Sequence, residues 1–300
     1  MPMLRLRTAA ILILGLAAGL GATVAAQREI TERHVYVRAT DAKGAPVQTL
    51  TPADLVVRED DIAREIIRVG AAPPPSHLVL LVDNTEEAQR LLIELRSSVT
   101  ALARQMNQLP SPPMMMLMSL AERPTRLVDF TTSDIAIEAG VNKLFPRPSS
   151  GSYFLDAIVE TAALLRKVKA ERPVILAFVM DRSPEFSDRV HRNIEEALDE
   201  AKASLWTIQL QDSAAGGGNQ NARERDSVVG DVTTWSGGLN RPVLSPQGLP
   251  AAFSDVAAAI LGRLDVTYGR PAALIPPKRL SVEARNTSSL RIVAPRWAAR

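Results

Sequence analysis

Apolar residues are concentrated in several short uninterrupted runs, and segments with a helical spacing follow most of them. Residues 78–82 (Leu-Val-Leu-Leu-Val) come after three consecutive prolines and run directly into Asp83. Such a run, bounded by turn signals, is typical of a strand buried on both faces of a parallel sheet. In residues 86–106, apolar side chains recur at intervals of three and four, which predicts an amphipathic helix. A buried strand followed by such a helix is the first unit of an α/β domain.

The same alternation of strand and helix continues to residue 264. Further strands are expected at residues 114–120, 173–180 and 204–210, with an antiparallel edge strand at 125–130 and a short strand at 242–244. Helices are expected at residues 133–144, 154–169, 188–203, 223–235 and 249–264. Strands that alternate with helices indicate a Rossmann-like, doubly wound and mostly parallel sheet with helices on both faces. We therefore predict one α/β domain over residues 77–264.

Both ends of the chain outside this domain have strand patterns. Residues 34–40 alternate, and further strands are expected at 45–50, 55–58 and 62–69, so that residues 28–70 form a small β unit. The tail, residues 265–300, alternates twice around Asn286 and is expected to form a β hairpin beside the N-terminal unit. The predicted architecture is thus an α/β domain with small β segments at both termini.

The first 26 residues have the pattern of an export signal. Arg5 and Arg7 precede an almost wholly apolar stretch at residues 9–22, and residues 24–26 (Val-Ala-Ala) suit a cleavage site. The apolar stretch is short for a spanning helix, although an uncleaved anchor is the competing interpretation. The chain has no cysteine, which excludes a lipid-anchored lipoprotein, disulfides and thiolate zinc sites. We predict an exported protein, periplasmic or secreted, with no stable membrane span after signal cleavage.

The charge of the chain argues against a nucleic-acid partner. The formal net charge of +2 includes Arg5 and Arg7, and without them 33 Lys and Arg balance 33 Asp and Glu. The charges are interspersed and aromatic residues make up only 4% of the chain. Neither a basic patch nor a stacking surface for bases is therefore expected.

Three segments place oxygen-bearing side chains at the ends of predicted strands or at the start of a helix: residues 83–87 (Asp-Asn-Thr-Glu-Glu), 151–158 (Gly-Ser-Tyr-Phe-Leu-Asp-Ala-Ile) and 180–183 (Met-Asp-Arg-Ser). In these segments the chain resembles a von Willebrand factor type A domain, and more narrowly the exported bacterial group called VWFA-related. That family has Asp-x-Ser-x-Ser after its first strand, a Thr before a Leu-Tyr-Asp-Ala-Ile-like helix start, and Thr-Asp-Gly after its fourth strand. Residues 35–60 and 234–238 are also similar to that group, so the resemblance covers most of the mature chain.

The resemblance implies a metal-ion-dependent adhesion site, which presents Mg²⁺, or Ca²⁺ or Mn²⁺ in its place, to an acidic residue of a partner protein. The residues matched to its ligands are Asp83, Thr85, Glu87, Ser152 and Asp181. Two departures stand out: Glu87 replaces a small hydroxyl, and Met180 and Arg182 flank Asp181 in place of Thr and Gly. Either Glu87 coordinates the ion directly, or Arg182 pairs with the acids and takes the ion's place.

Three functions remain open. The first, which the resemblance favours, is an exported, non-enzymatic protein-binding or scaffold module with a degenerate adhesion site. The second is a metal-dependent hydrolase or phosphatase that uses Asp83 and Asp181, because an Asp after a buried strand also occurs in aspartyl-phosphate enzymes. No lysine follows the strand at residues 173–180, and this missing role argues against such an enzyme. The third is a purely structural envelope protein whose β segments form the partner surface.

Overall fold

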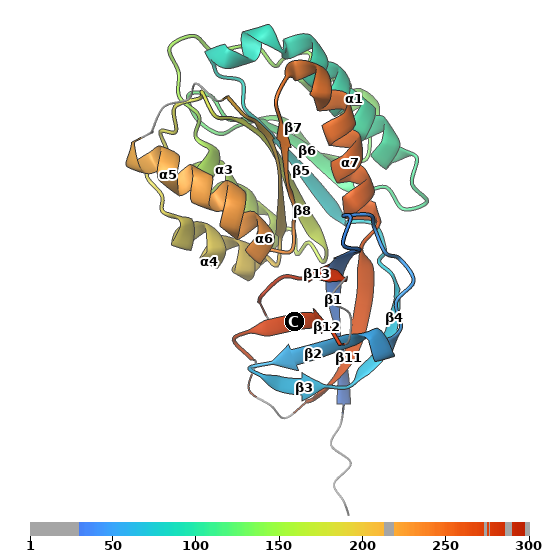
Figure 1. Cartoon of the computed structure of the whole chain (residues 1–300). Helices are drawn as coiled ribbons and strands as arrows, with labels where there is room; N and C mark the ends of the chain where they lie inside the picture. The colour runs from blue at the N-terminus through green and yellow to red at the C-terminus, as the bar shows by residue number, and fades with distance from the viewer. Residues whose placement is uncertain (1–29, 213–218, 273–274, 276, 286–289, 298–300) are drawn as a thin grey trace, which may run out of the picture.

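In the computed structural model, the chain forms an α/β domain with a β sandwich below it (Figure 1). The structure describes residues 30–212, 219–272, 275, 277–285 and 290–297. The predicted export signal, residues 1–26, and Asn286 lie outside these residues.

The α/β domain contains a six-stranded sheet with the strand order β10-β9-β8-β5-β6-β7. Its strands are β5 (His77–Val82), β6 (Met114–Ser119), β7 (Thr125–Thr131), β8 (Pro173–Met180), β9 (Ser204–Leu210) and β10 (Asn240–Val243). Neighbouring strands are parallel except for the edge strand β7, which is antiparallel to β6, as predicted. The strand order reverses between β5 and β8, which is where open α/β sheets form a ligand-binding crevice. The predicted fold class is confirmed.

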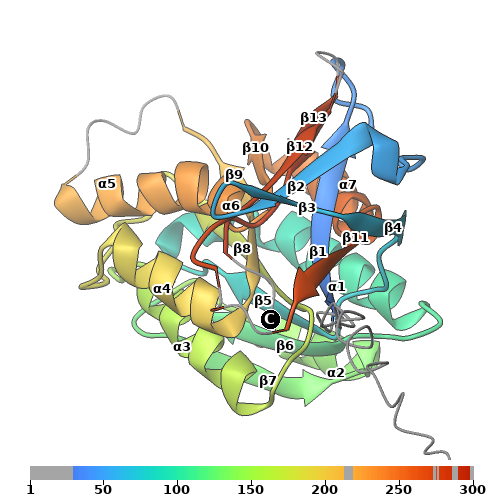
Figure 2. The ribbon, with the colours of Figure 1, turned by 90° about the horizontal axis from the view of Figure 1, so that it is seen from below.

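Helices cover both faces of this sheet (Figures 1 and 2). One face is covered by α1 (Leu92–Asn107), α2 (Asp134–Val141) and α7 (Leu249–Leu261). The other is covered by α3 (Phe154–Lys167), α4 (His191–Ala201), α5 (Gln220–Ser227), a π-helical turn (Val228–Val232) and α6 (Thr233–Trp235). Every residue of β8 is buried, because both of its faces pack against helices. This explains why the strand is apolar along its whole length.

The remaining strands form a sandwich of two sheets. The first sheet has the order β13-β1-β11-β4 and contains β1 (Ile30–Thr40), β4 (Ile66–Ala71), β11 (Leu264–Pro271) and β13 (Arg291–Val293). The second has the order β12-β2-β3 and contains β2 (Leu55–Glu59), β3 (Ile62–Arg64) and β12 (Leu280–Ala284). Alternate residues of both sheets, among them Val37, Val57, Val266 and Val282, share one apolar core.

Two expectations about the terminal segments are wrong. The two strands of the tail do not form a hairpin, because β12 pairs with β2 while β13 pairs with β1 in the other sheet. Residues 45–50 form no strand, apart from a single bridge between Thr40 and Pro46. A lone two-stranded hairpin is marginally stable in water, whereas strands divided between two sheets bury their apolar faces against each other. The N- and C-terminal segments therefore form one sandwich.

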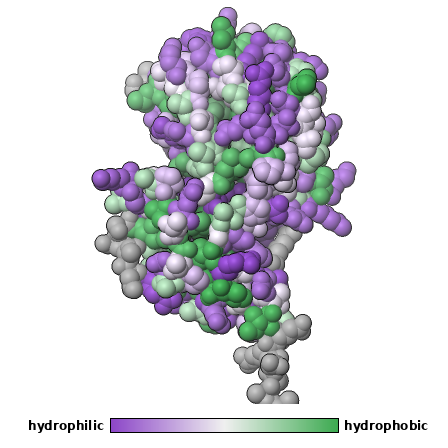
Figure 3. Space-filling model, turned by 90° about the vertical axis from the view of Figure 1, so that its right-hand side faces the viewer, coloured by the Kyte–Doolittle hydropathy of each residue, from purple (hydrophilic) through white to green (hydrophobic). Residues whose placement is uncertain are grey.

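No helix in the described part of the chain is both long enough and apolar enough to cross a membrane. On the side of α1 and α7, hydrophilic residues cover much of the α/β domain, and hydrophobic residues are more frequent toward the sandwich (Figure 3). Several exposed large hydrophobic side chains, including Phe145 and Phe186, belong to loops of the α/β domain instead. These loops form the candidate site.

Candidate functional site

Three loops meet at the carboxyl ends of β5 and β8, and we call residues 83–91, 145–153 and 181–190 together the loop cluster. Backbone hydrogen bonds join the three loops. The N–H of Arg147 donates to the carbonyl of Asn84 (2.9 Å), and the N–H of Ser152 donates to the carbonyl of Pro184 (2.7 Å). The loop cluster is thus one bonded unit at the switch point of the sheet.

Asp83 lies in the floor of the loop cluster, and only 1% of it is exposed. Its Oδ1 accepts a hydrogen bond from the N–H of Thr85 (3.0 Å). The hydroxyls of Thr85 and Ser183 share a hydrogen bond of 2.6 Å. Burial raises the pKa of the Asp83 carboxyl, and hydrogen bonds from Thr85 and Ser183 oppose that rise. Asp83 and Thr85 therefore occupy one buried polar cluster.

Ser152 lies close to the same cluster. It is buried, and its hydroxyl has no hydrogen-bond partner among the described residues. Its backbone bridges to Glu185, whose carboxyl is near enough to Asp83 for the Asp83 charge to affect its pKa. Three of the five predicted ligands, Asp83, Thr85 and Ser152, are thus brought together.

The other two predicted ligands are bonded to residues outside the Asp83 cluster. Glu87 forms an ion pair with Arg90 (2.5 Å). The Asp181 carboxylate accepts hydrogen bonds from the side chain of Gln209 (2.8 Å) and the N–H of Asp212 (3.2 Å). Arg182 pairs with Asp212 (3.1 Å), and the structure shows no pair between Arg182 and Asp83, Glu87 or Asp181. The expected pairing of Arg182 with these acids is therefore not seen.

Sequence reasoning included Ser183 in an oxygen-bearing segment but not among the ligands, and it missed Glu185 altogether. Glu185 is 1% exposed, its Oε1 accepts a hydrogen bond from the N–H of Ser187 (3.1 Å), and its Oε2 has no partner among the described residues. Burial raises the pKa of Glu185 to about 7, and the nearby Asp83 charge adds to the rise. The available signal was the alternation Ser-Pro-Glu-Phe-Ser at residues 183–187, in which every second residue is buried.

The side chain of Arg225 is buried beneath residues 181–187 and bonds to them. Its guanidinium is buried and donates to the carbonyl of Ser183 (2.8 Å). The Arg225 charge lowers the pKa of Glu185, but burial outweighs it. Residues 181–187 are therefore fixed over Asp83 by side-chain and backbone bonds.

The cluster is closed to the partner carboxylate that an ion of the adhesion type would bind. Its carboxylates and hydroxyls have the oxygen chemistry that Mg²⁺ and Ca²⁺ prefer. However, none of the five side chains is more than 2% exposed: Asp83, Thr85, Ser152, Ser183 and Glu185. Across the described residues, no three His, Asp or Glu side chains lie in a group that could hold a metal ion. A partner's carboxylate therefore has no path to an ion at Asp83.

Comparisons with known proteins bear on the fold. No family model and no curated protein matches the sequence. Proximal thread matrix protein 1 from the mussel byssus is similar at 10% identity and a TM-score of 0.49, over 72% of this chain and 50% of that one. This chain thus spans half the length of the mussel protein.

Von Willebrand factor type A structures are also among the similar ones. The domain from Catenulispora acidiphila has 8% identity and a TM-score of 0.46, over 90% of this chain and 75% of that one. The vWF domain of the type V pili tip protein Mfa5 from Porphyromonas gingivalis has 12% identity and a TM-score of 0.47, over 63% of this chain and 96% of that one. These structures carry the family description that the sequence motifs indicated, and at these identities they concern the fold alone.

Proposed function

We propose that this chain is an exported, non-enzymatic protein-binding module whose partner-binding surface is the loop cluster. The observation that supports it is a pair of exposed aromatic side chains, Phe145 (58% exposed) and Phe186 (49%), at the edge of the sheet where open α/β folds bind ligands. Aromatic side chains are enriched at the centres of protein interfaces, where they supply much of the binding energy. The two rings are therefore suited to anchor another protein.

Both aromatic residues are held in place by the loops that carry them. Asn84 donates to the carbonyl of Phe145 (2.9 Å), and the Arg96 guanidinium lies 5.2 Å from the centre of the Phe145 ring. The N–H of Phe186 donates to the carbonyl of Ser152 (2.8 Å). A side chain that is already ordered loses less conformational entropy on binding. The polar cluster around Asp83 thus serves to position the binding surface.

The hydrolase alternative receives less support from the site. An aspartyl nucleophile must reach its substrate, but Asp83 is 1% exposed and residues 181–187 are bonded over it. Asp181, the second acid of that alternative, is bound to Gln209 and to the backbone of Asp212. We therefore place the function in binding and not in catalysis.

Replacing both rings, as Phe145→Ser with Phe186→Ser, should weaken partner binding about tenfold or more, because a buried aromatic anchor is worth roughly 2 kcal/mol. The partner would first be captured in its native envelope through a photoreactive phenylalanine analogue at position 186 and identified by mass spectrometry. Isothermal titration calorimetry would then give Kd for the purified partner with each variant.

Ile62→Ser is the matched control, because Ile62 is 59% exposed but lies on β3 of the sandwich. It should leave the affinity unchanged. Equal affinities for the wild type and the double variant would overturn the proposed surface. A loss confined to Ile62→Ser would instead place the partner on the sandwich, as the structural alternative requires.

We propose further that this binding needs no ion at Asp83. Thermal unfolding with EDTA, or with millimolar Mg²⁺, Ca²⁺ or Mn²⁺, should give the same Tm. An ion that binds the native protein at a hundredfold excess over its Kd would add about 2.7 kcal/mol, which is easily seen. If one of the ions raises the Tm of the wild type but not that of Asp83→Ala, the prediction is wrong and Asp83 binds a cation.

A further inference from the structure

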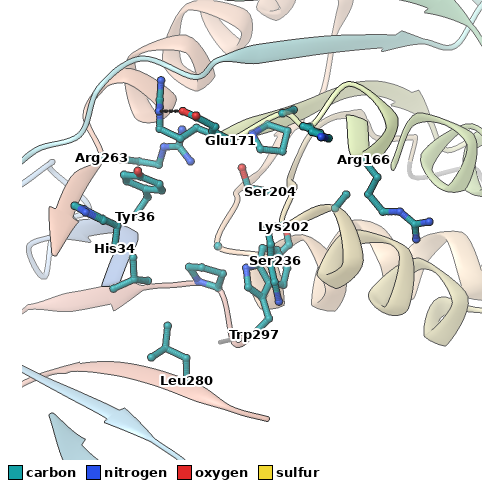
Figure 4. Close-up of a pocket in the computed structure, with 18 residues that line it drawn as sticks. His34, Tyr36, Arg166, Glu171, Lys202, Ser204, Ser236, Arg263, Leu280 and Trp297 are labelled. Carbon is teal, nitrogen blue, oxygen red and sulfur yellow. Dashed lines mark hydrogen bonds and ion pairs between the residues drawn. The ribbon is translucent and has the colours of Figure 1, made fainter. Parts of the chain in front are cut away.

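A cavity of about 750 Å³ lies at the opposite end of the sheet, between the α/β domain and the sandwich. Its walls come from the amino ends of β8 and β9, from β1, and from the C-terminal segment that carries Trp297 (Figure 4). Small-molecule sites typically have volumes of about 300–1,000 Å³ and are frequent at junctions between domains. The cavity therefore has the size and place of a ligand site, separate from the loop cluster.

Cationic side chains outnumber carboxylates in the lining of this cavity. The five that line it are Arg166, Lys169, Arg172, Lys202 and Arg263, and the lining contains one carboxylate, Glu171. Three of the cations have acidic partners, since Arg166 pairs with Glu200, Arg172 with Glu171 and Lys202 with Asp199. Among the described residues, Lys169 and Arg263 have no carboxylate partner. The cavity thus has an excess of positive charge.

Arg263 is a buried cation in the lining, with only 6% of its surface exposed. Its Nε donates to the carbonyl of Ile260 (3.0 Å), and its guanidinium lies 5.8 Å from the ring centre of Tyr36. The pKa of Arg263 is lowered to about 10, mainly by burial and in smaller part by the nearby charge of Arg172, while Tyr36 opposes the fall. A buried guanidinium that faces a second guanidinium is costly without an anion to compensate for it.

Helix ends explain only part of this charge. Lys169 follows the end of α3 and Lys202 follows the end of α4, where cations are favourable because the carbonyl ends of helices are partly negative. That effect operates at exposed positions and does not require a cation to be buried. Arg263 also follows the end of a helix, α7, and its Nε caps the carbonyl of Ile260. Unlike the two lysines, however, it lies beneath the surface beside Tyr36, and the helix end does not account for that burial.

We propose that this cavity binds a small organic anion, with a carboxylate or phosphate group at Arg263 and Arg172 and an apolar body against Trp297 and Leu280. Guanidinium groups match both kinds of oxyanion through paired hydrogen bonds. The apolar wall comes from both sides of the cavity, because Leu280 belongs to the core of the sandwich and Trp297 packs against Trp235 of the α/β domain (Figure 4). The site is independent of the protein partner proposed for the loop cluster.

The test is calorimetric titration of the full chain with benzoate, phenyl phosphate and inorganic phosphate. One of the two aromatic anions should bind saturably and more tightly than inorganic phosphate, and which one binds identifies the head group. Arg263→Met should weaken that binding about tenfold or more, because a hydrogen bond to a charged group is worth roughly 1.5–3 kcal/mol. Methionine fills similar space, and replacing an unpaired buried charge with an apolar side chain does not threaten folding.

Two further variants test whether the anion binds in this cavity. Lys169→Met changes only an exposed side chain and should weaken binding about threefold, because the lysine charge lies near the anion. Arg104→Met removes an exposed arginine of α1 that pairs with Glu138, and it should leave binding unchanged. Absence of saturable binding by all three probes would overturn the proposal. So would an affinity for the aromatic anion that is the same in Arg263→Met and in the wild type.

Discussion

Replacing Gly238 with alanine should destabilise the protein by about 3 kcal/mol, at the upper end of what overpacking costs. A Cβ at this position would lie 1.7 Å from the carbonyl oxygen of Leu205 and 2.7 Å from its carbonyl carbon. Both atoms belong to the backbone of β9, which is paired with β8 on one side and β10 on the other. Neither can move aside as a flexible side chain would.

The turn that contains Gly238 also makes two hydrogen bonds that the substitution would disturb. The hydroxyl of Ser236 accepts a hydrogen bond from the N–H of Leu205 (2.9 Å), and the N–H of Gly238 donates to the carbonyl of Thr233 (2.9 Å). Moving the turn away from β9 would leave these buried groups without partners, which adds to the cost of the clash. Glycine is needed here for close approach, since only the neighbouring Gly237 has a positive φ (84°).

Urea unfolding followed by tryptophan fluorescence measures this effect. Gly230→Ala is the control, because a Cβ at Gly230 meets nothing within 4 Å and the residue lies in the π-helical turn. It should change the free energy of unfolding by less than about 1 kcal/mol and in the stabilising direction. Similar unfolding midpoints for Gly238→Ala and the wild type would show that β9 and the turn are not packed as closely as the structure has them.

Much of the α/β domain could be predicted because its strands have a strong physical signature. A strand such as β8 is apolar at every position, since helices cover it on both sides, and the helical stripe of α1 is equally regular. The position of Asp83 follows from that regularity, because it is the first residue after β5. Its burial and its bond to Thr85 then follow from the place where the strand ends.

The remaining predicted ligands show what a motif does not determine. Asp181 also directly follows a buried strand, but its carboxylate is taken by Gln209 and the backbone of Asp212, which are distant in sequence. The motif fixes where such a residue stands along the chain, whereas bonds to the next strand and loop decide which way its side chain points. Glu185 is the converse case, a residue outside the motif that the folded loop 181–187 buries beside Asp83.

The terminal strands illustrate a related limit. The period-two pattern around Leu280 and Val282 correctly indicated a strand, and pairing with the N-terminal unit was expected. Periodicity identifies a buried face but not the sheet to which the strand belongs. Val57, Val266 and Val282 lie on three different strands and share one core. The strand with which each one pairs therefore depends on contacts that form only once both sheets are assembled.

Replacing Glu185 with glutamine should make the protein more stable above pH 7 and leave it nearly unchanged near pH 4. The pKa of Glu185 is about 7 in the folded protein, against an ordinary value of 4.5. As the pH rises from 4.5 to 7, the unfolded chain releases this proton before the folded one does, so the wild type loses stability over that window. A rise of this size corresponds to a loss of about 3 kcal/mol, fully present above pH 7.

Glutamine keeps the shape of the side chain and the oxygen that accepts from the N–H of Ser187, but it cannot ionise. The free energy of unfolding, measured in urea from pH 4 to 8, should therefore show a shallower fall with pH in Glu185→Gln. Glu87→Gln is the matched control in the same loop cluster, since Glu87 makes only a surface ion pair with Arg90, and such pairs contribute about 0–1 kcal/mol.

The sign of the change at pH 8 also decides between two states of the loop cluster. Without a cation, ionised Glu185 lies beside buried Asp83, the charge of Arg225 offsets this only in part, and removing the Glu185 charge is stabilising. With a cation bound between the two carboxylates, the charge of Glu185 would be favourable and the glutamine variant would be the less stable protein. A destabilised Glu185→Gln at pH 8 would thus contradict both the raised pKa and the ion-free surface proposed here. A stabilised variant would mean that no cation lies between Glu185 and Asp83. Burial of the ionised Glu185 side chain would then lower the stability of the loop cluster that carries Phe145 and Phe186.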